Sequence, residues 1–204
     1  MKYTPGYKTT KVNPALIDQV LAASFDAMEK KGADIRDVTR LEIRRAGHIN
    51  KNTFRYNFRD IGGVHTAIAQ DIRRYLESAL PRSIAPEQAM DMGFFLKLLD
   101  LLLLRQSHLD YAILSADRGF WPILLSALEP VLRNAWLGSS EQAYILSLKL
   151  LSTVLAETMT AWRDKQYAAS YRLSCAKLLY KYVGAIWEMN FQIQDYLDVV
   201  SVFR

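Results

Sequence analysis

The chain has 204 residues, of which 50% are hydrophobic and 23% charged, and its formal net charge is +5. This length suits one or two domains with a sizeable core, and the composition excludes an intrinsically disordered chain. The single cysteine, Cys175, excludes an internal disulfide framework and argues against a zinc cluster built on thiolates. We therefore expect the protein in the reducing cytoplasm.

The basic excess lies entirely in the N-terminal part of the chain. Residues 1–80 hold 14 Lys and Arg against 9 Asp and Glu, whereas residues 81–204 hold 12 of each kind. Within residues 40–59, six basic side chains stand against one acid, Glu42. A local excess of this kind suits a polyanionic partner.

No segment is predicted to enter a membrane. Residues 1–10 contain no apolar run, so we expect no signal peptide. The most apolar stretch, residues 90–104, is shorter than the roughly 20 residues that a bilayer span needs, and Lys97 and Asp100 interrupt it. This stretch is predicted to be a buried core helix.

Nearly all of the chain between its glycines and prolines has helical spacing, and no segment has a convincing strand pattern. The predicted fold class is therefore all-α. The first helix is predicted over residues 14–31. Asn13 can cap it, Pro14 suits its first position, and Gly32 suits its end.

The strongest start signal belongs to a pair of short helices. Thr39 and Glu42 have the spacing of a capping box at the start of the first helix, which ends at Gly47. Asn50 can cap the second helix, predicted over residues 51–57. Two short helices joined by a tight turn that contains glycine define a helix-turn-helix motif.

A second, larger helical domain is predicted beyond residue 80. The segment 81–86 begins and ends with proline and falls where the charge balance changes, so we place the boundary between domains 1–80 and 81–204 there. The tail beyond residue 190 is expected either to dock on this domain or to fray. Further helices are predicted from Asp60 to about residue 80, and at residues 87–105, 107–117, 120–137, 140–165 and 169–192. Pro122 and Pro130 are expected to mark a helix start and a kink or break.

Residues 39–58 resemble the DNA-binding segment of the TetR family of bacterial transcriptional regulators. The family pattern reads Thr-Val-x-x-Ile-Ala-x-x-Ala-Gly-Val-Ser-x-Gly-Thr-Phe/Leu-Tyr-x-His/Tyr-Phe, and the chain aligns with it without a gap. The positions that match in kind are Thr39, Ile43, Ile49, Thr53, Phe54 and Phe58. The resemblance implies a transcriptional regulator of the bacterial cytoplasm that works at the nucleoid, and we expect it to be a repressor, although the sequence itself does not distinguish a repressor from an activator.

Several positions depart from the family pattern. His48 stands at a turn position that favours positive φ, which His tolerates better than a β-branched residue does. Arg44 replaces a small alanine, so it is expected to point outwards or to snorkel. Arg55 replaces a tyrosine that touches the DNA backbone in the family. Gly62 and Gly63 are expected to weaken the first turn of the helix after the motif.

The resemblance makes helix 51–57 the candidate reader of the major groove. Lys51 can donate to guanine and Asn52 can pair with adenine, whereas Thr53 can touch a thymine methyl group or a phosphate. Tyr56 suits either a base or a phosphate, and the remaining contacts would hold the DNA backbone. Lys8 and Lys11 could add contacts from an N-terminal arm. The predicted DNA-binding residues are Thr39, Arg44, Asn50, Lys51, Asn52, Thr53, Arg55, Tyr56 and Arg59.

Apolar stripes run along the last two predicted helices, and they suit either packing within one subunit or a dimer face. The resemblance favours the homodimer, because TetR-like regulators pair through these helices and bind double-stranded DNA at a palindromic operator. The first stripe comprises Ile145, Leu148, Leu151, Ser152, Leu155, Met159 and Trp162. The second comprises Tyr171, Cys175, Leu178, Leu179, Tyr182, Ile186 and Met189.

Large apolar and aromatic side chains in the second domain suit a pocket for an apolar or aromatic small molecule. Taken one by one, such residues are more often ordinary core. A ligand would act by favouring a spacing of the two reading helices that no longer fits the DNA. The predicted ligand-binding residues are Met90, Phe94, Tyr111, Phe120, Trp121, Tyr144, Met159 and Trp162.

We expect no enzyme activity, no metal site and no cofactor. The histidines, His48, His65 and His108, have no metal-ligand spacing, and the chain carries neither a phosphate-binding glycine loop nor a Gly-x-Ser-x-Gly motif. The position of Cys175 on an apolar stripe favours a buried thiol over a redox sensor. The alternative function is a helical binding or adaptor protein of the same fold that has lost specific DNA binding.

Overall fold

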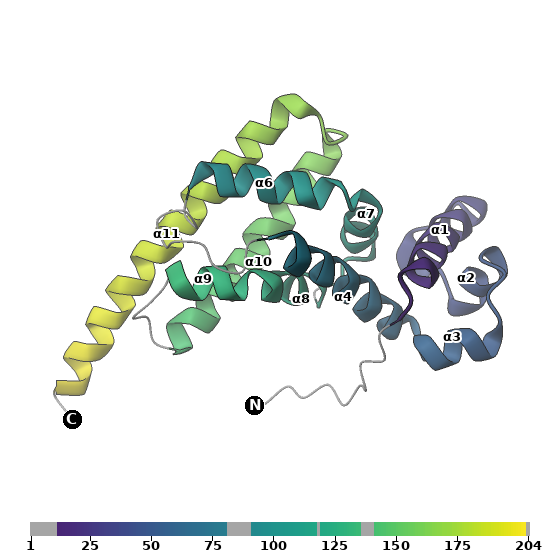
Figure 1. Cartoon of the computed structure of the whole chain (residues 1–204), viewed down its shortest axis with the longest axis horizontal. Coiled ribbons are helices and arrows are strands. Elements are labelled where there is room, and N and C mark those ends of the chain that lie inside the picture. The colour runs from purple at the N-terminus through teal and green to yellow at the C-terminus, as the bar shows by residue number, and fades with distance from the viewer. Residues whose placement is uncertain (1–11, 81–90, 118, 136–140, 203–204) are drawn as a thin grey trace. The chain divides into compact units, whose positions relative to one another are not determined.

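The computed structural model of the chain describes residues 12–80, 91–117, 119–135 and 141–202 (Figure 1). Every regular element in these ranges is an α-helix or a short 3-10 helix, so the all-α prediction is confirmed for them. The chain forms two compact units, Met1–Ile68 and Ala69–Arg204, and the division falls within helix α4 (Ile61–Ala79). The linker predicted at residues 81–86 lies outside the described ranges.

Helix α1 (Pro14–Lys31) is the central helix of the first unit. Its start is capped as predicted, because the Asn13 Oδ1 accepts the N–H of Ala15 at 3.0 Å. Gly32 ends it in the left-handed conformation, with φ of 60°. The buried face of α1 packs against α2 (Arg40–Ala46).

Helices α2 and α3 (Lys51–Asn57) form the predicted pair of short helices, with the predicted bounds. Their apolar anchors point into the core of the unit. The rings of Phe54 and Phe58, for example, lie 5.2 Å apart between centroids. The buried anchors are Val38, Ile43, Ile49, Phe54 and Phe58. Because these side chains hold one side of each helix inward, the polar side of α3 is left to solvent.

The second unit is a layered helical bundle. Helices α10 and α11 pack along each other, α6 packs against α11, and α7 and α8 pack against α10 (Figure 1). Its helices are α6 (Met92–Leu103), α7 (Gln106–Ser115), α8 (Phe120–Leu125), α9 (Glu129–Ala135), α10 (Glu141–Asp164) and α11 (Ala169–Val202).

Two of these helices differ from the prediction. The helix expected over residues 120–137, with a kink or break at Pro130, is divided into α8 and α9, and the 3-10 turn that divides them, Ser126–Leu128, lies just before that proline. Pro130 lies in the first turn of α9, where its missing N–H costs no helical hydrogen bond. Helix α11 continues to Val202, beyond the predicted end at residue 192.

A buried polar cluster joins α4 to α7 inside the second unit. The Nε2 of His108 lies 3.2 Å from the Oδ2 of Asp71, and both side chains are buried. Arg74 donates to the other oxygen of this carboxylate at 3.1 Å, and Arg105 lies 3.9 Å from it. The hydrogen bond with His108 lowers the pKa of Asp71 below its usual value, against the opposing effect of burial.

Candidate functional site

The first turn of α2 is fixed by the predicted capping box. The N–H of Thr39 donates to Glu42 Oε2 at 2.7 Å, and the N–H of Glu42 donates to Thr39 Oγ1 at 3.3 Å. The Nζ of Lys31, from α1, lies 3.1 Å from the other Glu42 oxygen. These contacts, led by the backbone hydrogen bond from Thr39, lower the pKa of Glu42 to about 2.

The turn between α2 and α3 has the predicted left-handed residue. His48 has φ of 52°, and the N–H of Ile49 donates to Arg44 O at 2.9 Å. A Cβ added at Gly47 would lie 2.9 Å from the Cβ of Ala23 on α1, closer than carbon atoms normally approach. The close approach of α1 therefore requires glycine at this position.

One residue that fixes this turn was not predicted from the sequence. The Nε2 of Gln19, on α1, donates to the carbonyl oxygen of Gly47 at 2.7 Å. This bond satisfies a carbonyl at the end of α2 and holds the turn against α1. An exposed glutamine on a helix has no motif or periodic signal, so only the folded structure reveals its role.

The exposed face of α3 consists of residues predicted to contact DNA. Asn50 caps the helix, with its Oδ1 accepting the N–H of Asn52 at 2.8 Å. Tyr56 is 75% exposed, more than any other large hydrophobic residue in the described ranges. The exposed residues of the helix are Lys51, Asn52, Thr53, Arg55 and Tyr56. The predicted reading surface is therefore open to a partner.

The cations on this face have no acidic partner in the part of the chain that the structure describes. Elsewhere in the first unit Lys30 pairs with Asp26, and Lys31 pairs with Glu42. By contrast, among the described residues no carboxylate lies within 4.0 Å of the side-chain nitrogens of three cations on or directly after α3, which are Lys51, Arg55 and Arg59. An exposed and unneutralised positive charge is what a polyanion needs.

Two of the predicted DNA contacts are less available than the others. Arg44 is half-buried, and its Nε is shielded from solvent without a hydrogen-bond partner in the described part of the chain. Its stem is therefore packed, as the snorkelling alternative expects. Thr39 is exposed, but its hydroxyl donates to Glu42 Oε2 at 2.8 Å. A phosphate contact from Thr39 would compete with the capping box.

The glycines after α3 have different roles. Asp60 caps α4 as predicted, because its Oδ1 accepts the N–H of Gly63 at 2.9 Å. A Cβ added at Gly63 would lie 1.7 Å from the carbonyl oxygen of Phe58, whereas one at Gly62 would meet only the Asp60 carboxylate, at 3.4 Å. Gly63 is therefore required by a close backbone approach, which the sequence did not reveal.

Most residues predicted to bind a small molecule are packed in the core of the second unit. The Nε1 of Trp162 donates to Ala168 O at 3.1 Å, across the turn between α10 and α11. The centre of the Tyr144 ring lies 4.4 Å from the guanidinium carbon of Arg133. Burial raises the pKa of Tyr144 to about 12. Met90 lies outside the described residues. The predicted residues that are buried are Phe94, Tyr111, Phe120, Trp121, Tyr144, Met159 and Trp162.

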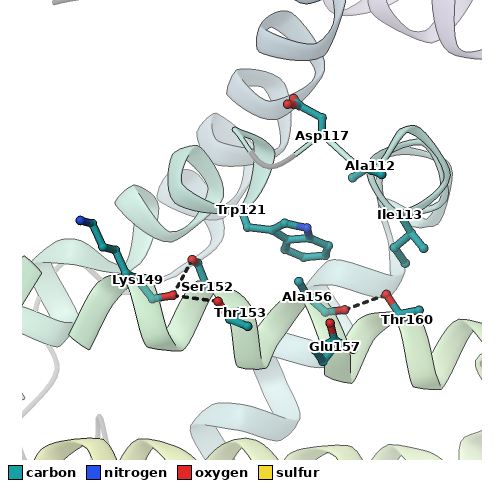
Figure 2. Close-up of a pocket in the computed structure, with 11 residues that line it drawn as sticks. Ala112, Ile113, Asp117, Trp121, Lys149, Ser152, Thr153, Ala156, Glu157 and Thr160 are labelled. Atoms are coloured by element: carbon teal, nitrogen blue, oxygen red, sulfur yellow. Dashed lines mark hydrogen bonds between the residues drawn. The ribbon is translucent and has the colours of Figure 1, made fainter. Parts of the chain in front are cut away.

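A cavity of about 610 Å³ nevertheless lies in this unit, and of the predicted residues that the structure describes only Trp121 lines it (Figure 2). Its other walls come from α7, with Ala112 and Ile113, and from Asp117, which follows α7. The floor is formed by α10. The residues of α10 that line it are Lys149, Ser152, Thr153, Ala156, Glu157 and Thr160.

The apolar stripes of α10 and α11 are divided between the core and the surface. On α10, Leu151, Leu155, Met159 and Trp162 are buried within the chain, whereas Ile145 is exposed. On α11, the buried members are Cys175, Leu179 and Ile186, and the exposed ones are Tyr171, Leu178 and Tyr182. Burial raises the pKa of the Cys175 thiol. Packing within the chain thus accounts for one side of each stripe and leaves the other side uncovered.

No protein-family model, curated protein or solved structure matches the chain. Within the described ranges, no helix has an apolar stretch long enough to cross a membrane. In the same ranges, no three His, Cys, Asp or Glu side chains are grouped closely enough to hold a metal ion. The function of the α3 surface is therefore inferred from its geometry and charge.

Proposed function

We propose that this chain is a TetR-like transcriptional repressor. As a homodimer it binds a palindromic operator, and each subunit inserts α3 into the major groove of the DNA. A small molecule bound in the second unit modulates the affinity for DNA. The observation that carries this proposal is the exposed face of α3, where Lys51, Arg55 and the following Arg59 have no acidic partner among the described residues.

The support is stronger than charge alone, because the helix is held as a reading helix needs to be. Phe54 and Phe58 fix its inner side, Asn50 fixes its start, and the turn before it is tied to α1 through Gln19. The backbone of α3 therefore needs no ordering when DNA arrives, which lowers the free-energy cost of binding.

The roles within α3 follow from position. Lys51 and Asn52, at its N-terminal end, meet base edges and supply sequence preference. Arg55 and Arg59 contact phosphates and supply affinity for any sequence. Replacing Lys51 by alanine should therefore cost about 1–3 kcal/mol and relax the preference at one base position, whereas replacing Arg55 should weaken binding to all sequences alike.

One α3 helix reads too short a stretch of DNA to select a site, and a dimer reads two such stretches. Two reading helices about 34–36 Å apart would meet successive turns of one face of the duplex. The uncovered side of the α11 stripe, with Tyr171, Leu178 and Tyr182 exposed, supports this arrangement. These residues lie seven and four positions apart, which places them on one face of the helix.

The test is a selection of duplexes from a random-sequence library with the full chain, followed by affinity measurements over a range of salt concentrations. The proposal expects enrichment of one palindrome and a steep fall in affinity with salt. Binding without sequence preference, or no binding, would favour the adaptor protein instead.

Three variants make the selection specific to α3. Lys51→Ala and Arg55→Ala should weaken binding to the selected palindrome, and only Lys51→Ala should change which sequences are selected. Lys97→Ala is the matched control, because Lys97 is an exposed cation on α6 outside the reading surface. Circular dichroism should show the same helix content in all three. Equal losses for Lys97→Ala and Arg55→Ala would contradict the assignment of the DNA surface to α3.

A further inference from the structure

The floor of the cavity beside Trp121 offers hydrogen-bond acceptors. The hydroxyls of Ser152 and Thr153 donate to the carbonyl oxygen of Lys149, at 2.9 and 3.2 Å, and Thr160 donates to Ala156 O at 2.9 Å (Figure 2). A hydroxyl has one proton, and in each of these side chains that proton is donated to a backbone carbonyl of the same helix. While these bonds are kept, the hydroxyl oxygens offer lone pairs to a ligand.

The charged groups of the cavity reinforce this preference. Asp117 and Glu157 both line it, and an ionised carboxylate is acceptor-only. Asp117 Oδ1 accepts the N–H of Gly119 at 3.0 Å, which fixes its position at the rim. Among the described residues that line the cavity, Lys149 is the one cation. Figure 2 shows it at one end of the lining residues of α10, with its ammonium group directed away from Trp121.

Trp121 supplies an aromatic wall. Figure 2 shows its ring between α10 and the side of the cavity formed by Ala112 and Ile113. Ala156, a small residue, lines the cavity on α10. An indole face attracts both aromatic rings and cations.

We infer that the cavity binds a protonated amine attached to a flat aromatic body. The aromatic body packs on Trp121, and the ammonium group donates to the carboxylates and hydroxyl oxygens around it. A volume of about 610 Å³ is in the range of small-molecule sites. The role of this amine as the effector rests on the proposed regulatory function, whereas the binding itself does not.

The test uses matched probes on the full chain in the absence of DNA, measured by isothermal titration calorimetry at pH 7. The probes are 1-naphthylmethylamine, 1-naphthylmethanol and 1-naphthoate, which share a ring system and differ in charge. The amine should bind at least about tenfold more tightly than the alcohol, because its hydrogen bonds are charge-assisted, and the carboxylate should bind most weakly. The N-trimethylated amine keeps the charge without N–H donors, and it should bind more weakly than the primary amine.

Variants locate the site. Glu157→Gln and Asp117→Asn remove one charge each. Each should weaken binding of the amine about three- to tenfold and leave the affinity for the alcohol unchanged. Asp117→Asn retains the oxygen that accepts from Gly119. Glu188→Gln is the matched control, since Glu188 is exposed on α11 and does not line the cavity. Ala156→Met fills the cavity and should weaken all probes, with thermal unfolding as the check that the variant folds.

The inference is overturned if no probe binds, if the three probes bind equally, if the carboxylate is preferred, or if Glu157→Gln and Asp117→Asn leave the amine unaffected. These outcomes are separate from those of the DNA selection. A chain that binds no DNA but binds the amine refutes the regulator and retains the site. A chain that selects a palindrome but does not bind the amine refutes the amine site and retains the regulator. Release of the selected duplex by the amine would support both.

Discussion

Replacing Gly63 by alanine gives the sharpest test of the geometry around the reading helix. The added Cβ would lie 1.7 Å from the carbonyl oxygen of Phe58, 2.7 Å from its carbonyl carbon and 3.2 Å from its Cα. All three are backbone atoms, so no side-chain rotation can relieve the overlap. Because a carbon and a carbonyl oxygen approach to about 3.3 Å, the junction between α3 and α4 would have to open by roughly 1.5 Å.

Two opposing effects set the size of the loss. Overpacking a rigid site costs about 1–3 kcal/mol and occasionally more, while alanine in place of glycine in a helix gains about 1 kcal/mol. The overlap is severe, so we expect Gly63→Ala to destabilise by about 2 kcal/mol or more. Gly62→Ala is the matched control, because its Cβ would meet only Asp60 Oδ1 at 3.4 Å. It should stabilise by roughly 0.5–1 kcal/mol.

The assay is hydrogen exchange followed by mass spectrometry, which resolves the peptides of α3 and the start of α4 from the rest of the chain. Gly63→Ala should accelerate exchange there, and Gly62→Ala should slow it. Affinity for the selected palindrome should fall with the first variant and not with the second. Equal protection in the two variants would refute the close approach of Gly63 to Phe58.

Three further substitutions test other parts of the structure. Thr39→Ala removes the acceptor for the N–H of Glu42 and should cost about 1 kcal/mol, measured by hydrogen exchange in α2; unchanged exchange would contradict the capping role. Because the pKa of Asp71 is lowered from 3.8, its stabilising effect is present above pH 3.8 and is lost as the pH falls through the lowered value. Asp71→Asn should therefore lower the urea midpoint at pH 7, and the midpoint of the variant should fall less than that of the unsubstituted chain between about pH 5 and pH 2. Equal falls in the two proteins would contradict the stabilising role of the Asp71 carboxylate. Met159 is 0% exposed, so Met159→Ala should lower the free energy of unfolding by about 2–5 kcal/mol, measured by thermal unfolding. A loss near zero would mean that Met159 lines an open pocket.

The parts of the fold that the sequence predicted are those set by local chemistry. The caps Asn13, Thr39 and Asn50 and the left-handed His48 each depend on neighbours within a few positions, so their residue types are sufficient evidence. The exposed side of α3 was predictable for the same reason, because Phe54 and Phe58 fix which side faces inward.

The parts that the sequence did not predict depend on segments that are distant along the chain. Gln19 reaches Gly47 only because α1 packs on α2. The cavity is lined by α7, α8 and α10, and its acceptor-rich floor comes from hydroxyls that bond to their own helix. Composition alone favoured the large aromatic residues as ligand contacts, yet most of these side chains fill the core, as large apolar residues usually do.

Lys51 shows how α3 departs from what stability alone would favour. It occupies the first position of the helix, next to the positive end of the helix dipole, and the first turn contains no acidic residue. It also precedes Arg55 by four positions, where like charges repel. Lys51→Glu should therefore stabilise α3 by about 0.3–1 kcal/mol, through the dipole and an attraction to Arg55.

The same substitution should abolish binding to the selected palindrome, because it places a negative charge against the DNA. Lys51→Gln is the matched control: it removes the charge without reversing it, so its effects on exchange in α3 and on DNA affinity should both be intermediate. A gain in stability together with a loss of binding is expected of a residue kept for recognition at the expense of the fold. If Lys51→Glu destabilised α3, or left DNA affinity unchanged, the positive charge at this position would have a structural role, and α3 would lose its place as the reading helix.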